Sequence, residues 1–225
     1  MPTIFTATAD SRYSFTAQFL RGAGIFAKHA REIEQSSGTT ATDEVVSEHR
    51  AFVVAAIIQS SAALEAEISE VAEYGPGHHL GSNGLDVLAH DLLNPIAAVI
   101  DDQPALERYQ LVLHLLHKPK FAPGHQPFQS VALLIRLRNE LVHYKSRFGS
   151  KMENIKFLET LRQLNHARPP FVSPQANFFP HHCLSAGCAI WSVNTALTFI
   201  DGFYDKLDIH SPLDAHRTSI LGLLT

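Results

Sequence analysis

The feature that most constrains the fold is a segment that is apolar on almost every side when it is drawn as a helix. Residues 52–64 contain only three polar side chains, Gln59, Ser60 and Ser61. A helix with one apolar stripe can lie on a protein surface, whereas one that is apolar all round must be covered on most sides. We therefore expect this segment to belong to the central helix of a bundle. The apolar run is too short to span a bilayer, so no membrane association is expected.

The rest of the chain also carries helical signals. Thr42 and Asp43 can accept hydrogen bonds from the free amides at the start of a long helix. Pro104 and Pro127 fit the first turns of two later helices, because the missing N–H costs nothing there. No segment shows the alternation of apolar and polar residues that marks a strand. We expect helices over residues 10–35, 42–74, 104–116, 127–148 and 184–207, with short helices that start at Ser150 and Ser211.

These elements predict an all-α fold, an up-and-down bundle of four principal helices with peripheral helices. Residues 1–41 are expected to form an N-terminal helix and a flexible connector, and residues 42–207 the bundle. Residues 208–225 are expected to form a short C-terminal helix packed on that bundle. Residues 165–180 contain four prolines and are expected to be irregular. A loop of that length in a compact domain usually has a function, contacts a partner or moves.

The charge of the chain limits the classes of partner. Only 18% of the 225 residues are charged, and the net charge is −4. This low charge predicts that much helix surface is buried, partly between subunits, and it gives no global sign of nucleic-acid binding. No signal sequence is visible, so a cytoplasmic protein is expected. Two cysteines, Cys183 and Cys188, are expected to stay reduced there.

Histidines and cysteines lie close together after the proline-rich segment and suggest a zinc site as an alternative. His181, His182, Cys183 and Cys188 do not match the spacing of a common structural zinc site. Cys188 also lies on the apolar face of the last long helix, where cysteine behaves as a small hydrophobic residue. We therefore expect no metal and no cofactor.

The helix expected from residue 127 contains an internal contradiction. Val131, Ile135 and Val142 form an apolar stripe, yet Arg138 falls in the middle of it. A buried charge is normally paired or coordinated, so this arginine calls for a partner or a function. It points about 140° away from His143 on an ideal helix. The arginine must therefore swing toward the histidine, or a second subunit must complete the site.

The neighbours of this arginine are also suited to chemistry. Asn139 and His143 are four residues apart and share one face of the expected helix. Residues 136–151 hold five basic side chains against one acid, Glu140, which makes a local basic patch for RNA. These basic residues are Arg136, Arg138, Lys145, Arg147 and Lys151.

The segment Arg138-Asn139-Glu140-Leu141-Val142-His143 resembles the Arg-x4–6-His motif of the HEPN superfamily, the higher eukaryotes and prokaryotes nucleotide-binding domains. The resemblance covers residues 45–207, with the first helix as an addition. The bare pattern is also met by Arg108 and His114. The polar residue after the arginine, the flanking leucines and the position late in a bundle helix distinguish the segment at 138–143.

The resemblance implies a homodimeric all-α bundle and, as in many members, a metal-independent endoribonuclease. It implies that His143 acts as the general acid/base, that Arg138 holds the scissile phosphate and that Asn139 orients the site. Glu65 and Tyr144 are expected to support these residues. Tyr144 directly follows His143, so the His-x-Tyr pattern of toxin-like members is not met and modification of the tyrosine is not implied.

Two functions follow from these expectations. One is an RNA-cleaving protein of a defence or toxin–antitoxin system, with a cognate antitoxin or regulatory protein as a further partner. The alternative is a non-catalytic HEPN-like dimerisation, interaction or nucleotide-binding module. In that module Arg138 pairs with a buried acid such as Glu65, and Asn139 bonds across helices. The complete Arg-Asn-x3-His set favours the enzyme, and the low overall basicity favours the module.

Overall fold

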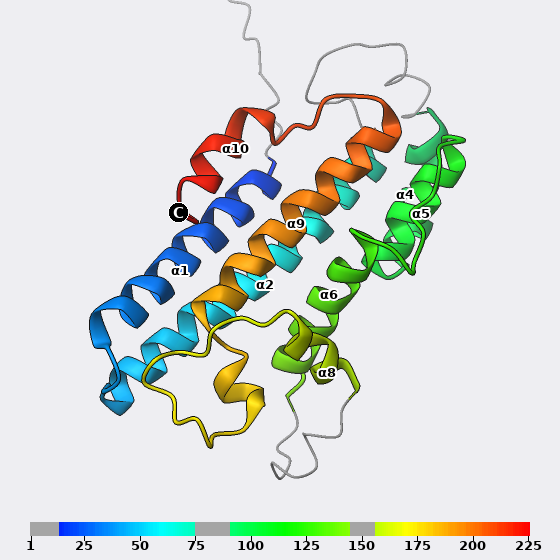
Figure 1. Cartoon of the computed structure of the whole chain (residues 1–225). Helices are drawn as coiled ribbons and strands as arrows, with labels where there is room; N and C mark the ends of the chain where they lie inside the picture. Colours follow the sequence, from blue (N-terminus) through cyan, green and yellow to red (C-terminus); the bar gives the residue numbers. More distant parts are fainter. Residues whose placement is uncertain (1–13, 75–90, 145–155) are drawn as a thin grey trace, which may run out of the picture.

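The computed structural model in Figure 1 describes residues 14–74, 91–144 and 156–225. Helices account for 72% of these described residues, which form no strand. The expected all-α class is therefore confirmed. The expected helix start at Ser150 lies outside the described residues, and α8 spans Lys156–Gln163.

Three long helices form the main body of the protein. They are α1 (Thr16–Ser37), α2 (Asp43–Tyr74) and α9 (Ala186–Leu207), and each packs on the other two (Figure 1). Gly38 joins α1 to α2 with a φ of 57°, a left-handed conformation that glycine adopts without strain. Helix α1, expected as an addition to the bundle, contributes Leu20, Ala23, Ala27 and Ala30 to the same core as α2 and α9.

Small residues let α1 approach its neighbours closely. Gly22 lies against Gln59 of α2, where an added Cβ would come within 2.1 Å of the Gln59 side-chain oxygen. Gly24 lies against Leu223 near the C-terminus, at 3.1 Å for the same added atom. Both glycines lower the intrinsic helix propensity of α1. Their positions show that the helix is held by packing rather than by propensity.

The segment 52–64 lies inside α2, as its composition predicts. Its most central side chains are fully buried: Val53, Ala56, Ile57, Ala63 and Leu64. By length and composition alone, α2 is also apolar enough to cross a membrane, the one such helix among the described residues. Half of its most apolar window is buried against the rest of the chain, and the core helix of a soluble protein meets the same criterion.

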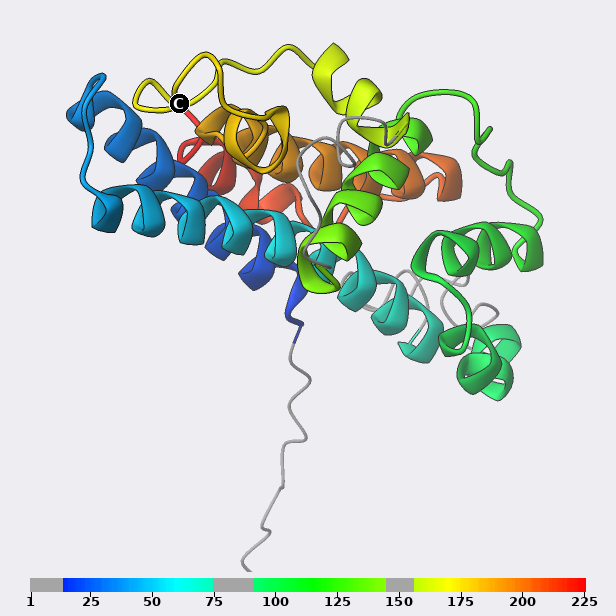
Figure 2. The same ribbon diagram turned by 90° about the horizontal axis from the view of Figure 1, so that it is seen from below.

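The remaining helices cover the other side of α2 and α9. They are α4 (Ala97–Asp101), preceded by a 3-10 turn at Asn94–Ile96, α5 (Ala105–Leu115), α6 (Phe128–Val142) and α8. Figure 2 shows α6 crossing α2, with α8 beside it. Aromatic rings fill the space that α5 and α9 share. The Tyr109 ring lies edge-on to Phe199 and Phe203, with 4.9 Å between ring centroids in both pairs.

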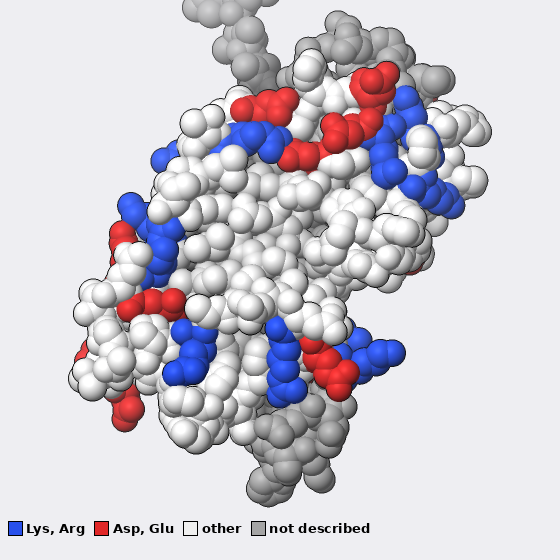
Figure 3. All heavy atoms as spheres, viewed as in Figure 1, with Lys and Arg blue, Asp and Glu red and all other residues white. Residues whose placement is uncertain are grey.

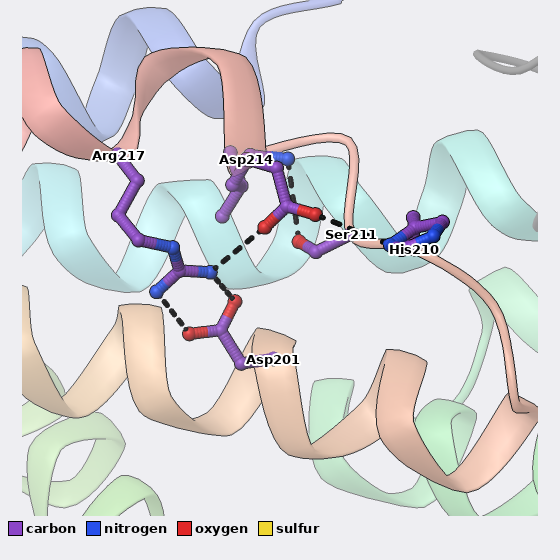
Figure 4. A network of polar contacts seen from close by, with 6 residues as sticks. Asp201, His210, Ser211, Asp214 and Arg217 are labelled. Atoms are coloured by element: carbon purple, nitrogen blue, oxygen red, sulfur yellow. Dashed lines mark hydrogen bonds and ion pairs between the residues drawn. The ribbon is translucent and has the colours of Figure 1, made fainter.

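The short terminal helix α10 (Asp214–Leu221) is fixed to α9 by ion pairs (Figure 4). Arg217 donates from both terminal nitrogens to Asp201, at 2.6 Å for the first contact, and also pairs with Asp214. The helix was expected to start at Ser211 but begins at Asp214, and Ser211 accepts from the Leu213 N–H at 3.2 Å in the turn before it. Bidentate pairing of this kind holds orientation as well as charge.

Two buried tyrosines place polar groups inside the core. The Tyr109 hydroxyl donates to the Leu64 carbonyl at 2.8 Å, and the Tyr204 hydroxyl donates to the buried carboxylate of Glu67. Burial, and next the nearby charge of Glu67, raises the pKa of both phenols well above the ordinary value. The fold therefore accommodates the neutral phenols and excludes the phenolates.

The free energy of unfolding is expected to fall as the pH rises past about 10, where unfolded tyrosine ionises. A phenol whose pKa is raised in the folded state contributes fully to the free energy of unfolding when the pH is below its unfolded-state pKa. This contribution is lost as the pH rises toward the folded-state pKa. Each tyrosine adds about 1.4 kcal/mol per pH unit to this slope. Urea unfolding at several alkaline pH values should show a shallower slope for Tyr109→Phe than for the wild type. An unchanged slope would contradict the buried phenol.

Candidate functional site

The motif Arg138 to His143 lies at the C-terminal end of α6. The helix was expected to continue to about residue 148, but it ends at Val142. His143 closes it, with its N–H bonded to the Asn139 carbonyl at 2.9 Å. The Tyr144 ring then lies beside Phe179, with 6.4 Å between centroids. The first residue after the helix cap is therefore in contact with a distant part of the chain.

Arg138 is the best-anchored residue of the motif. Its Nη2 group forms an ion pair with Glu65 of α2, and its Nη1 group donates to the Asn139 side-chain oxygen at 3.0 Å. The arginine side chain keeps 21% of its exposure and the glutamate keeps 41%. The structure thus joins Arg138, Asn139 and Glu65 in one cluster at the surface, open to solvent on one side.

His143 lies at the edge of this cluster and does not join it. Its side chain is exposed, and among the described residues no side-chain hydrogen bond or ion pair joins it to Arg138 or Asn139. The His143 N–H still bonds to the Asn139 carbonyl, as in a helical turn. The three proposed catalytic residues are therefore close together, but no polar side-chain contact joins the histidine to the arginine.

Uncovered apolar side chains surround the cluster. Val142 is 50% exposed, and on α6 it shares one face with Arg138 and Ile135. Ile58 is 36% exposed and lies on the same face of α2 as Glu65, seven residues later. The apolar face of α6 therefore continues past the part of α2 that covers it, which leaves a surface for another molecule.

Only part of the predicted basic patch lies among the described residues. Arg136 lies over the Phe157 ring of α8, with 4.9 Å from the guanidinium carbon to the ring centroid. It lines a groove of about 530 Å³ between α6 and α8, together with Lys156. Arg136 is two residues before Arg138 and therefore faces away from it. The other predicted RNA-binding residues, Lys145, Arg147 and Lys151, lie outside the described residues.

The second match to the bare motif has a different environment. Arg108 pairs with Asp101 at 3.1 Å and also donates to Ser69 and to the Gln103 carbonyl. His114 is exposed on the following turns of α5. This arginine joins α2, α4 and α5, which is a structural role, and it leaves His114 as a natural control for His143.

A buried pair that the sequence analysis missed lies where α1, α2 and α9 meet. His49 is 2% exposed and donates to Glu34 at 2.9 Å. The same glutamate oxygen accepts the Ala186 N–H at the start of α9, at 2.8 Å. Phe171 lies edge-on to His49 at 5.1 Å and covers the pair. No spacing rule connects these positions, since they come from separate helices and a loop.

The histidines and cysteines considered for zinc take other partners. Arg50 donates to His181 Nδ1 at 3.2 Å, and burial, followed by the charge of Arg50, lowers the pKa of His181. His182 donates to the Ser173 carbonyl at 2.9 Å. Both cysteines are buried thiols. Across residues 14–74, 91–144 and 156–225, no group of three or more His, Cys, Asp or Glu side chains is placed to hold a metal ion.

Comparison with known proteins identifies no relative. No family model, no curated protein and no solved structure matches the chain.

The ion pair between Arg138 and Glu65 is expected to add little stability, because the glutamate is largely open to water. Arg138→Ala and Glu65→Ala should each lower the free energy of unfolding by about 0.5–1 kcal/mol, and the double variant by less than the sum. Urea unfolding of the four proteins measures this coupling. A loss of several kcal/mol for either single variant would make the arginine a structural anchor of α6.

Proposed function

We propose that the chain is a HEPN-like protein that cleaves RNA without a metal, as a homodimer with a shared site. The observation that carries this proposal is the cluster of Arg138, Asn139 and Glu65 beside the exposed His143, on a surface with uncovered apolar side chains. The arginine is held in place yet keeps one side open to solvent. A pre-positioned guanidinium next to a free imidazole suits phosphoryl chemistry.

The proposed reaction uses the RNA 2′-hydroxyl as the nucleophile. His143 takes the 2′ proton, the 2′ oxygen forms a bond to phosphorus, and the bond from phosphorus to the 5′ oxygen breaks. A second histidine, from the other copy, returns a proton to the leaving 5′ oxygen. Arg138 stabilises the charge that develops on the phosphoryl oxygens, because a guanidinium pairs with phosphate in bidentate geometry. The products are a 2′,3′-cyclic phosphate and a 5′-hydroxyl.

Dimerisation supplies the contact that a single chain lacks. Helices α6 and α9 are two candidates for the interface. Two of the exposed large apolar side chains, Val142 on α6 and Ile58 on α2, lie on the helix faces that carry Arg138 and Glu65. The face over α9 is uncharged at its centre in Figure 3, but two exposed residues of α9, Asn194 and Thr198, are polar. A two-fold contact uses one patch twice, so a contact through α6 and α2 brings two copies of the motif together.

One observation favours the non-catalytic alternative. The Arg138 charge is already paired with Glu65, and among the described residues no hydrogen bond joins the His143 side chain to Arg138. In a dimerisation, interaction or nucleotide-binding module, this arrangement would hold α6 on α2 and shape the binding surface. A role in a defence or toxin system, with an antitoxin or regulatory partner, belongs to the proposal of RNA cleavage and needs its own genetic test.

The interface can be tested with one charge. Val142→Glu places a carboxylate on the proposed two-fold contact and should convert the dimer to a folded monomer at micromolar concentration. Val99→Glu is the matched control, because Val99 is 61% exposed on α4, away from α6. Light scattering gives the mass of each protein. A wild-type monomer, or a dimer that survives Val142→Glu, would contradict this interface.

Cleavage should persist in excess chelator and yield ends with 2′,3′-cyclic phosphate. A 2′-deoxy group at the scissile position should block the cut, because it removes the nucleophile. His143→Ala should slow cleavage on the order of 10²-fold or more, the usual range for a general acid/base. His114→Ala is the control and should cut at the wild-type rate, because its arginine is engaged elsewhere.

Arg138→Ala separates the two functions. In the ribonuclease it should slow cleavage to a degree typical of lost charge stabilisation, about 3–4 kcal/mol in activation free energy, and leave the dimer intact. A wild-type protein that never cuts RNA, combined with an Arg138→Ala variant that loses its dimer or melts early, would establish the interaction module instead.

A further inference from the structure

A cavity of about 260 Å³ lies apart from the Arg138 cluster, where the end of α8, the following loop and the first turn of α9 meet. Asn165 turns the chain after α8, with a φ of 52° in the left-handed region that asparagine tolerates. His166 then lies against Gly187, where an added Cβ would be 3.3 Å from the His166 Cβ. In Figures 1 and 2 the loop curves around the start of α9.

The rim of the cavity carries two positive charges that have no carboxylate partner among the described residues. Arg162 and Arg168 are both exposed lining residues. Arg162 lies over the Phe178 ring at 4.9 Å, and Arg168 donates to the Val172 carbonyl at 3.2 Å. The described residues that line the cavity include no acid. Unpaired guanidinium groups at a concave site attract anions and bind carboxylate or phosphate in bidentate geometry.

The wall of the cavity contains an unsatisfied polar atom. His166 lines the cavity, and its Nε2 atom is buried without a hydrogen-bond partner among the described residues. Such atoms are rare in native proteins, and each calls for an explanation such as a missing ligand. Burial lowers the pKa of His166, so the ring is neutral near pH 7 and can donate from one nitrogen.

The floor of the cavity is apolar. Leu161, Cys183 and Cys188 are buried there. Burial raises the pKa of both thiols, that of Cys188 to about 12, so both are neutral at physiological pH and behave as small hydrophobic groups. The start of α9 is not itself the anion site, because Glu34 already accepts the Ala186 N–H. The cavity thus combines an apolar floor, an aromatic wall at Phe178 and a cationic rim.

We propose that this cavity binds a small organic anion, a carboxylate or a phosphate monoester with an apolar body. The acid group pairs with Arg162 and Arg168 at the rim, and the apolar body lies between Phe178 and the buried floor. The volume is just below the usual range for small-molecule sites, which limits the ligand to the size of a small metabolite. The cavity is separate from the proposed RNA-cleavage site, and ligand binding there does not depend on RNA cleavage.

The single tryptophan of the chain reports directly on the site. Trp191 lies 6.2 Å from the His166 ring, centroid to centroid, so its fluorescence should respond when the cavity fills. Phenyl phosphate tests for binding of a phosphate monoester, and benzoate tests for binding of a carboxylate. Inorganic phosphate and phenol are the controls, because each carries only one of the two parts of phenyl phosphate. Calorimetry of the full chain gives the stoichiometry. We expect saturable 1:1 binding of one aromatic acid and much weaker binding of inorganic phosphate and of phenol.

Charge-removing variants locate the binding. Arg162→Gln and Arg168→Gln should each weaken the binding on the order of tenfold, since each removes a charge-assisted contact. Arg21→Gln, which removes an exposed charge on α1, should leave the affinity unchanged. If neither aromatic acid saturates at millimolar concentration, or if Arg21→Gln weakens binding as much as the rim variants, the proposal is wrong. Equal binding of inorganic phosphate would overturn the role of the apolar floor. If a variant fails to fold, the wild-type titration still decides whether the protein binds an aromatic acid.

Discussion

Covering α2 is the constraint on which the rest of the structure depends. The helix is apolar around most of its circumference, and burial of that surface is the dominant favourable term in folding. Helices α1 and α9 lie along it, and α5 and α6 cover part of the remainder. The cover is incomplete near Ile58 and Glu65. The candidate site therefore lies where the bundle stops protecting its own central helix.

The elements that could be predicted are those with local signals. The bounds of α2 and α9 follow from capping residues and apolar spacing, and Pro104 and Pro127 both directly precede helices. The end of α6 could not be predicted. Its last turns have good helical spacing, yet the helix ends at Val142. Tyr144 then lies beside Phe179, thirty-five residues later in the chain, a contact that no local pattern announces. Local propensity is therefore a weak guide to where a helix ends.

Helix α1 is a second case in which local propensity does not decide the structure. Gly22 and Gly24 weaken the prediction of a helix when the segment is considered alone. In the folded protein each glycine marks a place where a neighbour comes too close for a side chain. A glycine in a helical pattern has two meanings, and only the position of the neighbouring chain decides between them.

The sequence points to Glu65 as a partner for Arg138 because a charge in an apolar stripe needs an opposite charge, and that requirement can be stated without coordinates. No comparable sequence signal predicts the pair of Glu34 and His49. Glu34 is one acid among many, and its importance comes from meeting His49 and the first amide of α9 at one point. That junction orients α9 against α1 and α2, and Phe171 secures the long loop over it.

The proline-rich loop therefore has a structural reason for its length. It must travel from the end of α8 across the start of α9 to reach His49, and then return through the turn at Phe178–His182. Phe178 of that turn forms a wall of the cavity, while its neighbour Phe179 contacts Tyr144 beside the motif. One turn thus borders both sites. A ligand in the cavity can influence the motif only if it binds two arrangements of this turn with different affinity, and adjacent residues of one short turn are the physical connection through which such a difference would act.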